Sequence, residues 1–561
     1  MVFVALLCAA CSGGGANTAG PSEPATSSAS RTPAPQARGT AVFVIKWPVP
    51  PSETERRRRD YFSNSTASVS IIANGGAPVI ANNPALSPGG SGGTQTTSIS
   101  IAVPVGSNNT FRVNGWEGLN GGGNLLASGS VGSVTITKDE ANTIHITLRG
   151  NLANIVCAGT APFVSPRSVP TAMPTASAPA LTMVGPAGGI VLLPEDAGGN
   201  IIIMPGLIPS LALTAAVPSQ ATIASTSTGN EFNVNVLETN TAITLNTAGQ
   251  NLAGTTVSGT CSVTRVEALY VANHDTFGPV ANNPTVTIYP ASANGDATPV
   301  ATLAGSATAE DEIWFPAVDP SGTIYLSNEN QGESTGSVTE FAPVTEHLNV
   351  APVATIGGLY QPEGLALDAS NNLYAGVEQA IDVFAPGASG TPATMLRQIT
   401  GANTLLSTSE EYQVFVESTD STPGKIDVAM QNEINTYAPG ANGNVTPLQA
   451  IFGESTLLVS VLGVAADSSG NIYAADNTVN DIVEFSSTAT GDTAPTAIMK
   501  STSFDQPWGI FIDPANTIYV ANRGNNSILV FTSGTLPSET PSATISGADT
   551  GLDNPTGVYV R

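Results

Sequence analysis

Short runs in which apolar and polar residues alternate recur along the chain, and clusters of Gly, Asn, Ser or Pro separate them. A period of two predicts β-strands that bury one face and are joined by turns. The composition agrees with this pattern, because only 11% of the residues are charged while Gly and Pro are abundant. The sequence therefore predicts an all-β protein.

Residues 39–150 hold the clearest alternation. Its runs predict antiparallel strands with one buried face, at 41–47, 68–72, 97–103, 111–113, 133–136 and 143–148. Together they predict a β-sandwich domain. The stretch from Val103-Pro104-Val105-Gly106 to the glycines of 121–123 resembles the adhesin-type, immunoglobulin-like domains of exported bacterial proteins.

Residues 151–265 predict a second, less regular β-domain. Strand-like runs at 189–193, 201–204 and 232–237 are interrupted by proline-rich stretches at 162–180 and 205–218. Cys157 and Cys261 flank this segment, and no further Cys or His lies nearby to complete a zinc site. We expect a disulfide between these two cysteines in an oxidising compartment.

From residue 266 onward one sequence motif occurs four times. An aspartate, a turn and an Ile/Leu-Tyr strand recur at 318–328, 367–376, 466–476 and 512–522. Weaker copies lie at 269–273 and 425–429, and the copies are roughly 50 residues apart, which is the size of a four-stranded propeller blade. The aspartate could suggest a calcium loop, but without a bidentate acid at the right spacing a side chain that caps a tight turn is the simpler interpretation.

Further strands follow each copy of the motif in the same order, so residues 266–561 predict a six-bladed β-propeller. The first unit begins at its second strand near Val266, whereas the sequence finishes on a first strand at 556–561. We expect this last strand to pair with the strand near Leu269 and so to remove the exposed edges of an open ring.

The motif resembles the NHL repeat, and the best copies lie at 462–485 and 506–531. The resemblance implies a propeller fold. It implies no single activity, because NHL-like propellers include lactonases, lyases, sensor domains and interaction modules.

The N-terminal segment is short and apolar, and Cys8-Ala9-Ala10-Cys11 is followed by Ser12 and glycines. It resembles a bacterial lipoprotein signal, which implies removal of the leader, lipidation of Cys11 and export to the cell envelope, on the outer membrane or the cell surface. Residues 12–38 have the composition of a disordered tether. We expect a membrane connection through the lipid alone, because no segment is apolar for long enough to span a bilayer.

The formal net charge of -26 makes nucleic acid a poor partner, because no basic surface is available to neutralise phosphates. Cations or neutral polymers fit this charge better.

Candidate ligand-contacting residues gather on one predicted face of the propeller, formed by the loops before first strands and the loops between second and third strands. The loops before first strands supply Glu312, Trp314, Glu363, Glu411, Trp508 and Asn554. The other loops supply His274, Asp275, Asn328, Glu329 and Glu378. This acidic face with two indoles suits a cation, a sugar or a peptide.

Three functions remain open at this stage. A monomeric binding scaffold for a protein, peptide or carbohydrate ligand is favoured. The resemblance implies that lyases of this fold rely on histidines near the channel, and this chain has only three histidines. The alternatives are a calcium-dependent, lactonase-type hydrolase that uses Glu363 with Asn554 or Glu312, and a purely structural envelope protein. We assign no catalytic residue, and calcium is the one cofactor that we expect if the hydrolase is correct.

Overall fold

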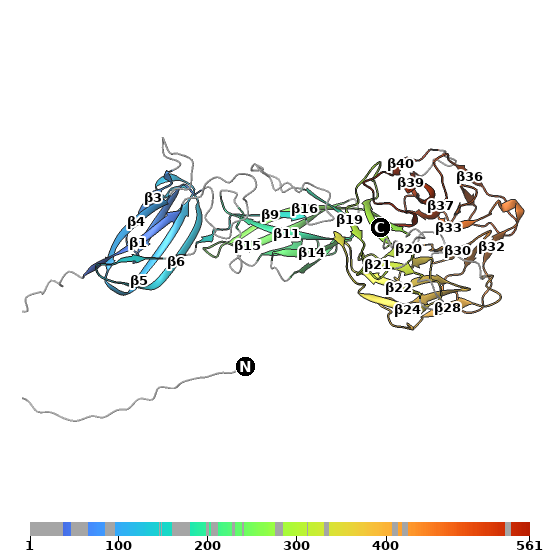
Figure 1. Cartoon of the computed structure of the whole chain (residues 1–561), viewed down its shortest axis with the longest axis horizontal. Helices are drawn as coiled ribbons and strands as arrows, with labels where there is room; N and C mark the ends of the chain where they lie inside the picture. The colour runs from blue at the N-terminus through green and yellow to red at the C-terminus, as the bar shows by residue number, and fades with distance from the viewer. Residues whose placement is uncertain are drawn as a thin grey trace, which may run out of the picture.

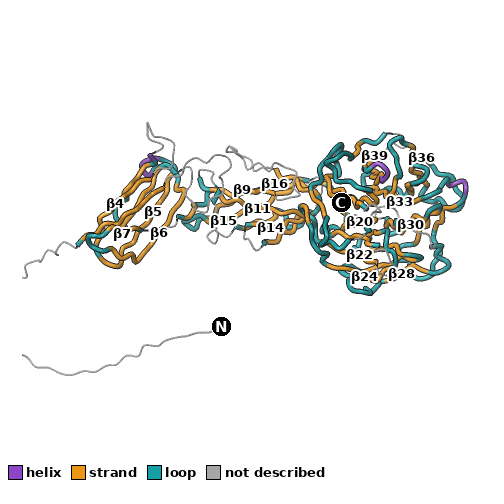
Figure 2. Tube along the Cα trace, in the orientation of Figure 1, coloured by secondary structure: helices purple, strands orange, loops and turns teal. Residues whose placement is uncertain are grey.

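We describe the protein from a computed structural model. Almost all of its regular structure is β-strand, and the few short turns of helix stand out in purple in Figure 2. None of the helices in the described residues is long and apolar enough to cross a membrane. The structure describes residues 37–46, 66–84, 96–144, 146, 148–159, 180–197, 201–202, 211–226, 230–237, 241–274, 284–310, 312–329, 336–406, 413–417, 424–532 and 540–561.

Three parts follow one another along the long axis of the molecule (Figure 1). The first consists of two sheets, which we call the N-terminal sheets. One has the order β4-β1-β7 and the other β3-β2-β5-β6-β8. Their strands are β1 (Arg38–Lys46), β2 (Ser68–Ala73), β3 (Val79–Asn82), β4 (Thr96–Pro104), β5 (Gly106–Trp116), β6 (Leu125–Ile136), β7 (Ala141–Thr143) and β8 (Arg149–Gly150).

One apolar core lies between the N-terminal sheets. The ring of Phe43 in β1 meets the ring of Phe111 in β5 edge to face at 5.3 Å, and Ile71 packs with them. Burial alternates along β5, as the sequence predicts. The run at 143–148 differs from the single strand that we predict there, because β7 ends at Thr143 and β8 begins only at Arg149.

The second part, the middle sheets, also shares one core between two sheets. Their orders are β10-β16-β15-β12 and β13-β14-β11-β9. The predicted interruption at 205–218 contains a strand, β12, because its backbone pairs with β15. The strands are β9 (Asn154–Gly159), β10 (Ala180–Val184), β11 (Ala187–Glu195), β12 (Ala212–Ala215), β13 (Ala221–Ser225), β14 (Glu231–Val236), β15 (Ala242–Gln250) and β16 (Thr256–Val266).

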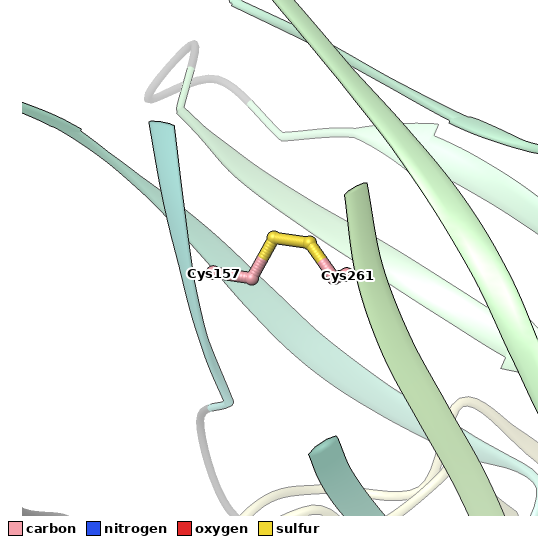
Figure 3. The surroundings of a disulfide bond; sticks show 2 residues. All are labelled: Cys157 and Cys261. Carbon is pink, nitrogen blue, oxygen red and sulfur yellow. A yellow bond between two sulfur atoms is a disulfide. The ribbon is translucent and has the colours of Figure 1, made fainter. Parts of the chain in front are cut away.

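A disulfide joins Cys157 of β9 to Cys261 of β16, with the two Cα atoms 6.2 Å apart (Figure 3). Because β9 and β16 belong to different sheets, the bond ties the two middle sheets together across their core.

The third part, which we call the ring, contains six sheets of four or five strands among the described residues from 268 to 560. Each sheet runs outward from a first strand near the centre, and the arrangement is β-propeller-like (Figure 1). The six sheets have the orders β41-β17-β18-β19-β23, β20-β21-β22-β24, β25-β26-β27-β28, β29-β30-β31-β32, β33-β34-β35-β36 and β37-β38-β39-β40.

The strands of the ring are short and mostly buried. The first three sheets contain β17 (Ala268–Asn273), β18 (Thr285–Pro290), β19 (Ala301–Leu303), β20 (Ile313–Val318), β21 (Ile324–Asn328), β22 (Gly336–Phe341), β23 (His347–Leu348), β24 (Ala354–Leu359), β25 (Leu365–Leu367), β26 (Leu373–Val377), β27 (Ala380–Phe384) and β28 (Arg397–Thr400). The last three sheets contain β29 (Val414–Val416), β30 (Ile426–Met430), β31 (Glu433–Tyr437), β32 (Gln449–Phe452), β33 (Val461–Ala466), β34 (Ile472–Asp476), β35 (Asp481–Phe485), β36 (Ala497–Lys500), β37 (Pro507–Ile512), β38 (Ile518–Asn522), β39 (Ser527–Phe531) and β40 (Ala543–Ile545). β41 (Pro555–Val560) belongs to the first sheet, beside β17.

The two ends of this region meet in one sheet, as the sequence predicts. β41 pairs antiparallel with β17, so that Leu269 lies opposite Val560 and Val271 opposite Val558. The first strands also contact one another in a complete cycle, in the order β41, β20, β25, β29, β33, β37 and back to β41. The ring is therefore closed through its central strands.

A second set of contacts joins neighbouring sheets at the periphery. The turn between the third and fourth strands of one sheet forms a parallel bridge to the fourth strand of the preceding sheet, as Gly295 does with Ile545 and Gly443 with Ile399. Beside these bridges the sequence Gly-x-x-Thr recurs at 305–308, 401–404, 453–456 and 547–550, and its threonine hydroxyl donates to the glycine carbonyl.

The middle sheets are connected to the ring with almost no linker. β16 ends at Val266 and β17 begins at Ala268, so Glu267 alone separates them. Val184 of β10 packs into the same apolar cluster as Ala268 and Tyr270 of the ring. These contacts hold the middle sheets against the ring.

Candidate functional site

Three side chains of the predicted contact face and a neighbouring arginine contact one another in a row. The ring of His274 lies 4.3 Å from Trp314, Trp314 stacks on Trp508 at 5.6 Å, and the guanidinium of Arg523 lies 4.3 Å over Trp508. The topology brings them together, because β20 and β37 both contact β41 while His274 follows β17. We call this row the aromatic stack.

The aromatic stack closes the centre of the ring at the end where the first strands begin. Trp314 and Trp508 are only 6% and 7% exposed, and Phe315 and Leu462 complete their cluster. Trp314 Nε1 donates to Glu329 Oε2 at 2.8 Å. The indole N–H of Trp508 is buried and has no acceptor among the described residues.

The other predicted contact residues surround this stack in different environments. Glu363 is buried, whereas Glu312, Glu378 and Asn554 are partly exposed at the rim. Glu411 and Asp275 lie outside the described residues, as do Cys8 and Cys11. Within the described residues, no three His, Cys, Asp or Glu side chains gather in a way that could hold a metal ion.

Asn328, which we predict to contact a ligand, is buried and instead binds the backbone of a loop. Its Oδ1 accepts from the N–H of Glu312 and its Nδ2 donates to the carbonyl of Ala309, so it holds the loop before β20. Other sheets have an Asn or Asp at the same position, at the end of the second strand, and it binds the corresponding loop: Asn273, Asp476 and Asn522.

The repeated aspartates cap their turns, as the sequence predicts. Asp368 Oδ1 accepts the backbone N–H groups of Ser370 and Asn372, both at 2.9 Å. The same pattern of two accepted backbone N–H groups occurs at Asp319, Asp467 and Asp513. These carboxylates stabilise the turns between first and second strands.

A carboxyl group that no motif marks is buried beside the contact face. Glu310 is 8% exposed, and Thr339 Oγ1 donates to its Oε1 at 2.6 Å. Its Oε2 has no hydrogen-bond partner among the described residues. Burial raises the pKa of Glu310 to about 8, although the bond from Thr339 opposes the shift.

We expect Glu310→Gln to remove a pH dependence of stability. The folded state keeps Glu310 protonated below about pH 8, whereas the unfolded chain ionises near its usual pKa of 4.5. The stabilising effect of the protonated form is complete below pH 4.5 and is lost as the pH rises towards 8. Over that window the free energy of unfolding of the wild type should fall, relative to Glu310→Gln, by about 1.4 kcal/mol per pH unit.

Urea unfolding of both proteins at pH 5, 6.5 and 8, followed by tryptophan fluorescence, measures this difference. Exposed Glu346 provides the matched control, because Glu346→Gln should leave the pH dependence of the wild type in place. Parallel curves for wild type and Glu310→Gln would contradict the assignment.

The structure also shows a cavity of about 380 Å³ at the opposite end of the ring, where the first strands finish. Its lining includes Arg265, Glu267 and Arg561, none of which belongs to the predicted contact residues. Their signal in the sequence is weak, because Arg265 and Arg561 stand at the ends of two strands that only the folded chain brings together.

Comparison with known protein families supports the repeat. The NHL repeat model matches residues 504–531, which contain β37, β38 and β39. No curated protein matches the chain. Among solved structures, a protein of unknown function from Bacteroides caccae is similar at 10% identity and a TM-score of 0.38, over 53% of this chain and 98% of that one. A protein from Lactobacillus plantarum is similar at 12% identity and a TM-score of 0.35, over 53% and 99%.

Proposed function

We propose that this chain is a lipid-anchored interaction scaffold of the bacterial cell envelope. Its ring serves as a six-bladed, NHL-type propeller that binds a protein, peptide or carbohydrate partner. Two sandwich domains, residues 39–150 and 151–265, hold the propeller away from the membrane. The lipid on Cys11 and the tether after it provide the attachment.

The closed set of six sheets supports the propeller part of this proposal. An NHL repeat at residues 504–531 lies in one sheet, and the other sheets repeat its turn-capping aspartate or its strand order. Closure gives β17 a hydrogen-bonded partner on its inner side, so that the first and last strands of the ring are held in one sheet, which suits a protein that displays a rigid surface outside the cell.

The disulfide between Cys157 and Cys261 supports export, because such bonds persist in oxidising compartments. The single residue between β16 and β17 supports the role of the middle sheets as a stiff spacer. A stiff spacer would fix the direction in which the propeller faces.

The aromatic stack is the observation that carries the binding proposal. It lies on the face formed by the loops before first strands, where a partner on this face would meet it. The loops of the same face also carry three partly exposed acidic side chains, Glu312, Glu329 and Glu378. A partner that shifts the aromatic stack on binding would supply an acceptor to the buried N–H of Trp508, which a sugar hydroxyl or a peptide carbonyl can provide.

A carbohydrate and peptide array probed with the mature full-length chain tests this proposal. For the ligand identified, we expect Trp508→Phe to weaken binding about five- to tenfold, because the substitution removes one N–H and keeps an aromatic ring. Trp116→Phe in the N-terminal sheets is the matched control and should leave binding unchanged. The absence of any array ligand, or equal binding by both variants, would contradict the proposal.

The proposed anchor predicts that Cys11→Ser abolishes incorporation of labelled palmitate and moves the protein from the membrane fraction to the soluble fraction. Cys8→Leu keeps the residue pattern expected of the signal and should still be lipidated. Lipid labelling of Cys11→Ser at the wild-type level would show that the anchor lies elsewhere.

A further inference from the structure

The cavity at the far end of the ring has the size of a small-molecule site. Its volume of about 380 Å³ falls in the range of roughly 300–1,000 Å³ that is usual for such sites. The last residues of the first strands form its wall, and Leu237 and Arg265 of the middle sheets complete the lining. It lies between the ring and the middle sheets, away from the proposed contact face.

The inner end of the cavity meets the buried aromatic cluster at the centre of the ring. Phe315 lines the cavity and also belongs to the buried cluster of Trp314, Trp508 and Leu462. This cluster separates the cavity from the face with the aromatic stack, and the cavity faces the middle sheets through Leu237 and Arg265.

Aromatic side chains give this pocket apolar walls. In three of the first strands every residue but one is buried. The partly exposed residue is Phe415 in β29, Phe511 in β37 and Tyr559 in β41. All three line the cavity, and the rings of Phe511 and Tyr559 lie 4.9 Å apart. The exposed part of these rings is apolar surface that a planar or aliphatic ligand could cover.

Two arginines supply the positive groups of the pocket. Arg265 is 5% exposed, and its Nη1 donates to the carbonyl of Val236 at 3.1 Å. Its Nε is buried without a partner among the described residues. Burial lowers the pKa of Arg265, and so does the positive charge of Arg561 nearby. The two guanidinium groups therefore repel each other.

The acidic groups around the pocket are mostly engaged in other contacts. Asp368, Asp467 and Asp513 accept the N–H groups of their own turns, and Glu417 forms an ion pair with Lys425 at 3.0 Å. Glu267 faces the arginines, and burial, together with the charge of Asp513, raises its pKa. An incoming anion would reduce the repulsion between the two arginines.

We propose that this pocket binds a small carboxylate with an aromatic or aliphatic body, held by Arg265 and Arg561 at one end and by the partly exposed rings of Phe415, Phe511 and Tyr559 along its length. The site lies at the opposite end of the ring from the proposed contact face and does not depend on the proposed function.

Isothermal titration calorimetry of the full-length chain tests the site with indole-3-acetate, benzoate and hexanoate as probes. Tryptamine, which replaces the carboxylate of indole-3-acetate by an amine, serves as the ligand control. We expect at least one of the three carboxylates to bind and tryptamine to bind at least tenfold more weakly. If none of the carboxylates binds at millimolar concentration, or if tryptamine binds as well as indole-3-acetate, the proposal is wrong.

Two variants locate the binding site. Arg561→Gln removes one charge from the lining of the pocket, and Arg265→Gln removes the buried one. Each substitution should weaken binding at least tenfold. Arg112→Gln, the same substitution at an exposed position of β5 in the N-terminal sheets, should have no effect. Thermal unfolding identifies any variant that fails to fold, and Arg561→Gln remains informative if Arg265→Gln does not fold. Unchanged binding by the folded variants would overturn the proposal.

Discussion

Replacing Gly557 with alanine should strongly destabilise the ring, although the substitution adds only one methyl group. Gly557 lies in β41, where the first strands meet at the centre of the ring. A Cβ atom at this position would lie 2.4 Å from the carbonyl oxygen of Trp314 and 2.7 Å from Cα of Phe315. Because both contacts are with backbone, neither atom can move without shifting β20. We expect a loss of about 3 kcal/mol or more in the free energy of unfolding.

Gly132→Ala is the matched control for this substitution. Gly132 also lies in a strand, and its nearest neighbour to an added Cβ is Thr110 Cγ2 at 3.9 Å, which is an ordinary contact. Differential scanning calorimetry of the two variants and the wild type measures the effect. A ring transition in Gly557→Ala at the wild-type temperature would show that β41 does not pack at the centre as described.

Removing the disulfide should have the second largest effect, confined to the middle sheets. The bond closes a loop over a sequence separation of 104 residues, and loops of that size confer about 3–5 kcal/mol when the unfolded chain is constrained. We therefore expect the double variant Cys157→Ala, Cys261→Ala to lower the unfolding temperature of the middle sheets, while the transition of the ring moves less.

Reduced wild type is the control for the disulfide variant. Dithiothreitol should bring the wild type close to the double variant and leave the double variant itself unchanged. A double variant as stable as the oxidised wild type would show that the disulfide contributes nothing to the middle sheets.

Much of the fold can be predicted because the sequence carries two kinds of pattern. Alternation locates strands such as β5, in which one face is buried and the other is exposed. It fails for β17 and β20, where every residue is buried. There the repeat provides the signal instead, because β17 contains the weak copy at 269–273 and β20 ends at Val318, where a full copy begins. β12 escapes prediction because proline-rich neighbours obscure a short strand that depends on pairing with β15.

Less of the candidate site can be predicted. The order of the strands places Trp314 and Trp508 on one face, but only packing decides that the two indoles stack and become buried. Glu310 carries no motif, since its environment comes from Thr339 in another strand. The recurring Gly-x-x-Thr sequence at 401–404 and 547–550 is a signal for contacts between sheets, but its meaning emerges only once the bridges beside it are known.

Hydrogen–deuterium exchange at β17 tests the closure of the ring most directly. In the closed ring β17 has hydrogen-bonded neighbours on both sides, β18 and β41, so its amides should exchange as slowly as those of β21 and β38. A chain truncated after Asn554 lacks β41, and residues 268–273 should then exchange faster than the second strands of the other sheets. Fast exchange of 268–273 in the full-length chain would contradict a closed ring.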